Sequence, residues 1–198
     1  MAGTFLYRRF QPFFCIETMD KLNEFKNFLN DKSKTVGTCS DGFRDISGIK
    51  NPDDLQRVGE KYFFFACEKG MITPEILEEF DLPFLRVNEN VTDACVLVTS
   101  EDEPITAYGH SFAVVMGKGK LEAYNNTEVL ALDESEVDAW DDCLVHAKGH
   151  SKVNAKDFSK VYALEDSTVD GGYESYIIQK SPTAKIINSV HFADATKK

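Results

Sequence analysis

The residues best suited to chemistry in this chain are a cysteine and a histidine, Cys39 and His110. A cysteine hydrolase needs a thiolate nucleophile, a histidine that holds its proton, and a polar group that orients the histidine. Cys39 would be the nucleophile, His110 the base and Asn126, or its neighbour Asn125, the orienting residue. The sequence predicts no helix after Cys39, so the helix dipole that activates many catalytic cysteines would be missing. Cysteine hydrolysis is therefore the alternative interpretation, beside a His110 that only faces solvent near a tight turn.

Metal and phosphate sites lack the spacing that they need. His146 and His150 are four residues apart but have Gly149 between them and no third ligand. The acids Asp138, Asp141 and Asp142 do not follow the spacing of a calcium loop. The Gly-Lys-Gly-Lys run at 117–120 is flanked by predicted strands, whereas a phosphate loop precedes a helix. We expect no metal and no cofactor.

Charge is unevenly distributed along the chain, whose net charge is −11. Residues 1–70 carry 11 Lys and Arg against 10 acids, whereas residues 71–198 carry 11 against 23. A site for a nucleic acid, RNA or DNA, therefore belongs in the N-terminal third. Tyr7, Phe10 and Phe43 would be stacking platforms there. The candidate nucleic-acid-binding residues are Arg8, Arg9, Lys26, Lys32, Lys34, Arg44, Lys50, Arg57 and Lys61.

The acidic remainder suggests a second kind of partner. Apolar residues at 137, 140, 144 and 145 predict a helix over residues 133–148. A helix with many acids on its surface fits an interaction with a basic protein, with the chain acting as an adaptor or polyanion mimic. The acids are Asp133, Glu134, Glu136, Asp138, Asp141 and Asp142.

Hydrophobic patterning predicts an α+β fold with a mainly antiparallel sheet and two or three helices packed on it. The unbroken apolar run 62–67 predicts a central strand, followed by a helix at 74–80 that Thr73 and Pro74 begin. Helical spacing predicts a helix at 19–29, and alternation predicts a strand at 42–49. Further strands are expected at 94–99, 161–164, 173–179 and 185–192, with a hairpin at 110–124. No internal repeat is identified, and the expected units are residues 1–90 and an acidic β-rich half, 91–198.

Two resemblances add to this interpretation. The pieces YRRF at 7–10, Gly42-Phe43, Val58 and FFFACEKGMITPEI at 63–76 resemble the N-terminal domain of the RdgC recombination-associated family. That resemblance implies DNA binding without sequence preference, and a similar fold is implied for phage nuclear-shell-associated proteins that bind RNA. Separately, residues 37–43 and the segment after His110 resemble the nucleophile and histidine segments of NlpC-type cysteine peptidases.

Composition bears on the expected cellular location of the protein. Five cysteines without Cys-x-x-Cys spacing are typical of reduced core thiols, which fits the cytosol. No run of about 18 apolar residues is present to cross a membrane, so we expect a cytoplasmic protein, in the host cell if it is viral. The leading interpretation is a non-enzymatic, phage-encoded nucleic-acid-binding protein.

Overall fold

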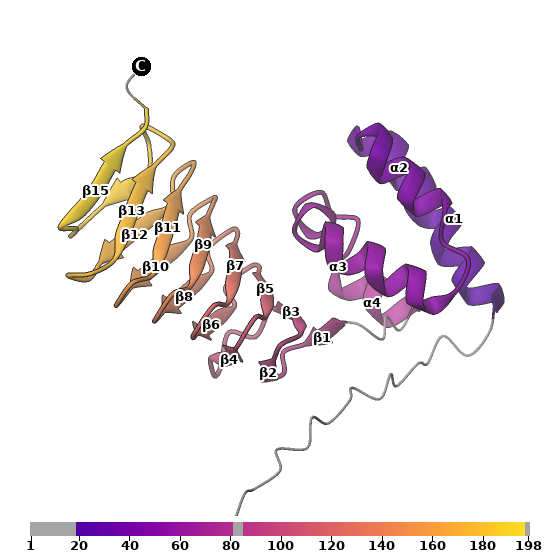
Figure 1. Cartoon of the computed structure of the whole chain (residues 1–198), viewed down its shortest axis with the longest axis horizontal. Coiled ribbons are helices and arrows are strands. Elements are labelled where there is room, and N and C mark those ends of the chain that lie inside the picture. Colours follow the sequence, from indigo (N-terminus) through magenta and orange to yellow (C-terminus); the bar gives the residue numbers. More distant parts are fainter. Residues whose placement is uncertain (1–18, 81–84, 197–198) are drawn as a thin grey trace, which may run out of the picture.

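The computed structural model describes residues 19–80 and 85–196 and consists of four helices followed by a parallel β-solenoid (Figure 1). The helices are α1 (Met19–Val36), α2 (Ser40–Ser47), α3 (Pro52–Glu68) and α4 (Pro74–Phe80). Residues Leu22, Phe25 and Leu29 form the buried stripe of α1. Asn51 is the N-cap of α3: its side chain accepts a hydrogen bond from the Asp54 N–H at 2.9 Å, and Pro52 follows in the first turn.

The solenoid is built from short parallel strands that alternate between two sheets. Sheet A contains the odd-numbered strands from β1 to β15, and sheet B contains the even-numbered strands from β2 to β14. From β4 to β13 the register is constant. Val137 pairs with Val153, and Val153 pairs with Val169. The stretch of chain from one paired residue to the next is therefore one coil of the solenoid. The strands are β1 (Leu85–Val87), β2 (Val91–Thr92), β3 (Cys95–Val98), β4 (Ile105–Tyr108), β5 (Phe112–Val115), β6 (Lys120–Ala123), β7 (Glu128–Ala131), β8 (Glu136–Ala139), β9 (Leu144–Ala147), β10 (Lys152–Ala155), β11 (Lys160–Ala163), β12 (Thr168–Gly171), β13 (Tyr176–Gln179), β14 (Lys185–Ile186) and β15 (His191–Asp194).

Each coil consists of two octads, each with a short strand and a short turn. The second and fourth strand residues, such as Val137 and Ala139, point inward and are fully buried. The last turn residue, such as Ser135, is also buried, and its N–H donates to the carbonyl of Leu132 at 3.1 Å. Small inward residues let the two sheets approach closely, and this explains the repeated Val-x-Ala pattern in the strands between 129 and 163.

The second residue of the turns between β6 and β12 has a left-handed backbone. Asn125, Asp133, Asp141, Gly149, Asp157 and Glu165 occupy this position with φ between 51° and 63°. Side chains here also join adjacent coils, because Asp133 Oδ2 accepts from the Gly117 N–H at 2.9 Å and Asp141 Oδ2 from the Asn125 N–H at 3.0 Å. Asn, Asp and Gly are the residues that tolerate this conformation best.

The helices pack on the outer face of sheet A, at the β1 end of the solenoid (Figure 1). Outward residues Leu97, Val114 and Leu130 belong to the same buried cluster as the helix residues. Phe64 of α3 contacts Phe112 of β5 with ring centroids 6.0 Å apart. A separate cluster of inward residues fills the solenoid, so sheet A is buried on both faces along its first strands.

The predicted α+β fold with an antiparallel sheet is wrong, because every strand pair in the described solenoid is parallel and the helices precede the strands. The expectation that the chain lacks an internal repeat is also wrong, as the octads show. The helix predicted over 133–148 is instead two strands, β8 and β9, with their turns. The apolar residues that predicted this helix include Val137 and Val145, which are inward residues of successive octads and not one face of a helix.

Two strands predicted in the N-terminal third are helices. Residues 62–67 lie in α3 and residues 42–49 lie largely in α2. The apolar run suits a helix here because Phe63 and Cys67 join the core while Phe64 contacts the solenoid, so α3 is covered on more than one side. The predicted hairpin is wrong too, since β5 and β6 belong to different sheets. The helices beginning at 19 and 74 and the strand at 94–99 are confirmed.

Candidate interaction face

The outer face of sheet A is covered by helices over its first strands and not over its later ones. Leu97, Val114 and Leu130, one in each of β3, β5 and β7, lie under the helices. The same row continues as His146, Tyr162 and Ile178 in β9, β11 and β13, which are only partly buried. We call this continuation the open face; it comprises Leu144, His146, Lys148, Lys160, Tyr162, Leu164, Tyr176, Ile178 and Lys180.

Aromatic rings and lysines lie together on the open face. The His146 and Tyr162 rings stack with centroids 5.1 Å apart. Lys160 Nζ lies 5.1 Å and Lys180 Nζ 5.7 Å from the centroid of the Tyr162 ring, within the range of cation–π attraction. Burial, which disfavours the charged form, lowers the pKa of His146. The open face therefore combines partly buried apolar area with two ammonium groups around one tyrosine.

None of the residues of the open face is acidic, although the chain has 33 acids, and Glu128 of β7 borders the face beside Leu144. Lys148, at its border with the helices, is paired with Glu68 of α3 at 3.0 Å. In the described part of the chain, neither Lys160 nor Lys180 has such an acid within ion-pair distance. The lysines of the open face thus differ from Lys34, Arg44, Arg57, Lys61 and Lys152 elsewhere on the molecule, which are paired with acids.

The outer face of sheet B is polar and mixed in charge. Lys120, Glu136 and Lys152 follow one another along the first strand position, and Lys152 Nζ lies 2.9 Å from Glu136 Oε1. They line open hollows of about 580 and 220 Å³. Tyr108, Tyr124 and Trp140 stack along the adjacent corner, and Lys156 Nζ lies 3.6 Å from the centroid of Trp140. This face differs from the open face because it does not continue a row that the helices cover, and its Lys152 is neutralised by Glu136.

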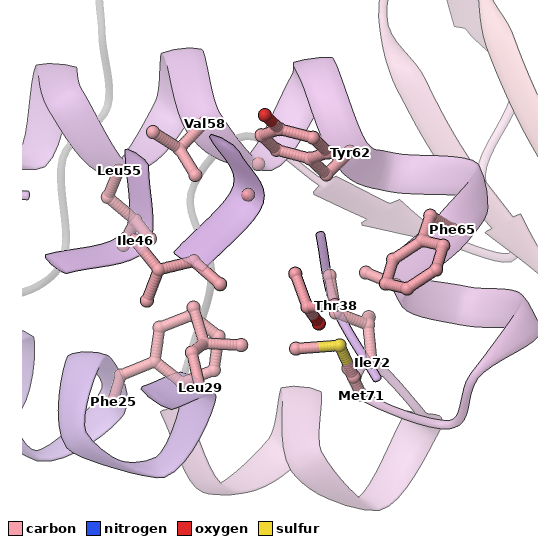
Figure 2. Close-up of a pocket in the computed structure, with 13 residues that line it drawn as sticks. Phe25, Leu29, Thr38, Ile46, Leu55, Val58, Tyr62, Phe65, Met71 and Ile72 are labelled. Atoms are coloured by element: carbon pink, nitrogen blue, oxygen red, sulfur yellow. The ribbon is translucent and has the colours of Figure 1, made fainter. Parts of the chain in front are cut away.

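An apolar cavity of about 30 Å³ lies between α1, α2 and α3 (Figure 2). Figure 2 shows Phe25, Ile46, Leu55 and Val58 on one side of it and Met71 and Ile72 on the other. The Thr38 hydroxyl is buried beside it without a hydrogen-bond partner. The volume of this cavity suits one water molecule and is too small for a metabolite.

The structure corrects one argument about Cys39. This residue is exposed and is the N-cap of α2, and its Sγ accepts from the Gly42 N–H at 3.4 Å. A helix therefore does follow it, contrary to the sequence-based expectation. His110 and Asn126 lie in stacked turns of the solenoid, where the Asn126 N–H donates to the Gly109 carbonyl at 3.0 Å. The catalytic pairing of Cys39 with His110 stays a prediction.

The predicted nucleic-acid residues are spread over α1, α2, the turn before α3, and α3 itself; Arg8, Arg9, Tyr7 and Phe10 lie outside the described residues. Lys34, Arg44, Arg57 and Lys61 each form an ion pair with an acid of the helical unit at 2.7–3.1 Å. Lys26 Nζ donates to the Ile49 carbonyl at 2.8 Å, and Lys32 lies over the Phe28 ring. Lys50 precedes α3, and Phe43 on α2 is exposed. Nucleic-acid binding by this set stays a prediction.

The acids predicted to share one helix are distributed around the solenoid. Asp133 and Glu134 lie in one turn, Glu136 and Asp138 in β8, and Asp141 and Asp142 in the opposite turn. Across residues 19–80 and 85–196, no group of three His, Cys, Asp or Glu side chains is arranged to hold a metal ion. Among the described helices, none combines the length and the hydrophobicity needed to cross a membrane.

Comparison with known proteins gives no match: no family model, no curated protein and no solved structure is similar to this chain. The resemblances to the RdgC and NlpC families therefore stay untested. Sequence reasoning missed the open face because its residues come from strands that are one full coil apart in the chain. The octad period is the signal that would have revealed it, since it places Leu144, Lys160 and Tyr176 in one row.

Proposed function

We propose that this protein is a non-enzymatic adaptor that binds a protein partner on the open face of its solenoid. The observation that carries the proposal is continuity: the chain's own helices cover the first half of the outer row of sheet A, and the same row then continues partly uncovered. Tyrosine is enriched at the centre of protein interfaces, whereas charged residues are found mainly at the polar rim. A β-solenoid suits this role because stacked coils hold such a row in fixed register.

The geometry of the other candidate sites supports this choice. The cavity is too small for a metabolite, and the basic residues of the helical unit are mostly engaged with neighbouring acids or carbonyls. The mixed charges of sheet B are paired across the strands. On the open face, partly buried apolar area lies beside Lys160 and Lys180, which have no acidic partner among the described residues.

Site-specific photo-crosslinking in the organism that encodes the chain tests the proposal. p-Benzoylphenylalanine replaces Tyr162 on the open face or, as a matched control, Asp170 on the outer face of sheet B; both sites are half-buried strand residues. A discrete protein adduct from position 162 and not from position 170 is the expected result, and Ile178→Glu should reduce it. Equal adducts at both positions, or none at position 162, would contradict the adaptor function.

A further inference from the structure

The open face has an electrostatic character opposite to that of the rest of the solenoid. Residues 85–198 carry 19 acids against 11 Lys and Arg, yet the outward residues of β9, β11 and β13 include no acid. The ammonium groups of Lys160 and Lys180 approach the Tyr162 ring from different strands, one at the start of β11 and one just after β13. A partner on this face therefore gains most by bringing carboxylates to the lysines and an apolar surface to the tyrosines.

The contact between α3 and the border of the face shows how a carboxylate reaches one of these lysines. Glu68 is the last residue of α3, and its Oε1 lies 3.0 Å from Lys148 Nζ. The pKa of Glu68 is lowered: burial, the largest single effect, raises it, but Lys148 and Lys69 together outweigh burial. One helix of this chain thus already combines apolar contacts to sheet A with a glutamate on a lysine of the open face.

The dimensions of the face suit another helix. Neighbouring strands of a sheet are about 4.8 Å apart, so β9 and β13 lie about 10 Å apart with β11 between them. A helix with its side chains is about 10 Å in diameter, so one helix covers three strands. Leu144, Leu164 and Ile178 add aliphatic area on the strand positions that surround Tyr162.

From these contacts we infer that the open face binds an acidic amphipathic helix, which lies beside α3 and places carboxylates on Lys160 and Lys180. This inference rests on the proposed adaptor function and specifies the chemistry of its partner. The lysines provide selectivity, because close charge pairs across an interface favour one partner and exclude those of the opposite sign.

Fluorescence anisotropy with the full chain and synthetic helices tests the inference. One labelled helix has a leucine and phenylalanine stripe and glutamate at its other positions; a second has glutamine in place of each glutamate. We expect the glutamate helix to bind at least about tenfold more tightly, and the double variant Lys160→Glu, Lys180→Glu to remove that preference. The matched control is Lys120→Glu, Lys185→Glu, which makes the same change of charge on sheet B and should leave binding unchanged.

Other outcomes separate this inference from the adaptor function. Equal binding of both helices, or loss of binding in both double variants, would overturn the acidic-helix inference while a crosslink at position 162 still supports an adaptor. Preferential binding of a single-stranded oligonucleotide that depends on Lys160 and Lys180 would overturn both. Sedimentation tests whether the chain self-associates through these lysines. Such self-association would identify a second copy as the occupant of the open face and overturn the acidic-helix inference. Absence of binding by any probe also overturns the inference, while the crosslinking experiment decides the function independently.

Discussion

At the scale of single residues, the left-handed turn position is where the octad restricts the choice of amino acid. Asp157 occupies it with φ of +51°, and none of the described side-chain hydrogen bonds compensates its strain. Asp157→Gly should raise the free energy of unfolding by about 0.5–1 kcal/mol, because glycine adopts this conformation without a Cβ clash. Asp157→Val should lower it, since a β-branched residue is strained there. Urea denaturation measures both, and a more stable valine variant would contradict the argument.

The buried thiols make the free energy of unfolding depend on pH in the alkaline range. Burial is the largest cause that raises the pKa of Cys95 and of Cys143 to about 12, and it raises the pKa of Cys67 as well. A group whose pKa is higher in the folded protein stabilises it fully below the unfolded pKa and loses that contribution as pH rises through the folded value. The free energy of unfolding should therefore fall from about pH 9 to about pH 12, by up to about 1.4 kcal/mol per pH unit for each thiol.

Denaturant unfolding at several pH values measures this slope. Cys143→Ala should make it shallower, whereas Ser151→Ala, at the equivalent octad position without a thiol, should not change it. An identical slope in the two variants would show that Cys143 titrates alike in folded and unfolded chains.

The same burial should protect Cys67, Cys95 and Cys143 from thiol reagents while the exposed Cys39 reacts.

At the scale of elements, the repeating unit is one coil and not one strand. Deleting residues 152–167 removes β10 and β11 and joins Ser151 to Thr168, which restores the octad sequence. This variant should stay folded and lose stability in proportion to the missing coil, because each coil contacts only its neighbours. Deleting only 152–155 should abolish cooperative unfolding, since it removes a strand and leaves two turns in succession. Circular dichroism during urea titration distinguishes the two, and equal loss of structure would contradict a modular solenoid.

Local signals in the sequence were enough for some elements and misleading for others. The helix that starts at Met19 was predictable from the spacing of Leu22, Phe25 and Leu29, which all face one core. The run 62–67 was not, because burial of α3 by both helices and solenoid removes the polar side that marks a surface helix. The individual strands 161–164 and 173–179 were recognised approximately, but their parallel pairing depends on the coil, which no single strand reveals. The open face was unpredictable for the same reason.

At the scale of the whole molecule, the attachment of the helices to the solenoid depends on the outer row of sheet A. Leu130 is 3% exposed and belongs to the cluster shared by both parts, but it does not line the solenoid interior. Leu130→Glu should destabilise this contact by several kcal/mol, because it buries a charge against apolar helix residues. Hydrogen exchange should then rise in α3 and α4 while β10 to β13 stay protected. A uniform rise over the solenoid would show instead that the two parts unfold as one.

The parallel register of the coils also makes the molecule mechanically anisotropic. Hydrogen bonds between strands point from coil to coil, so the few backbone bonds that join a pair of strands lie along the long axis of the solenoid. Tension applied between its two ends loads few bonds at a time, so coils peel away in sequence, each releasing about 55 Å of chain. Force applied along the strands loads all the bonds of a strand pair together in shear.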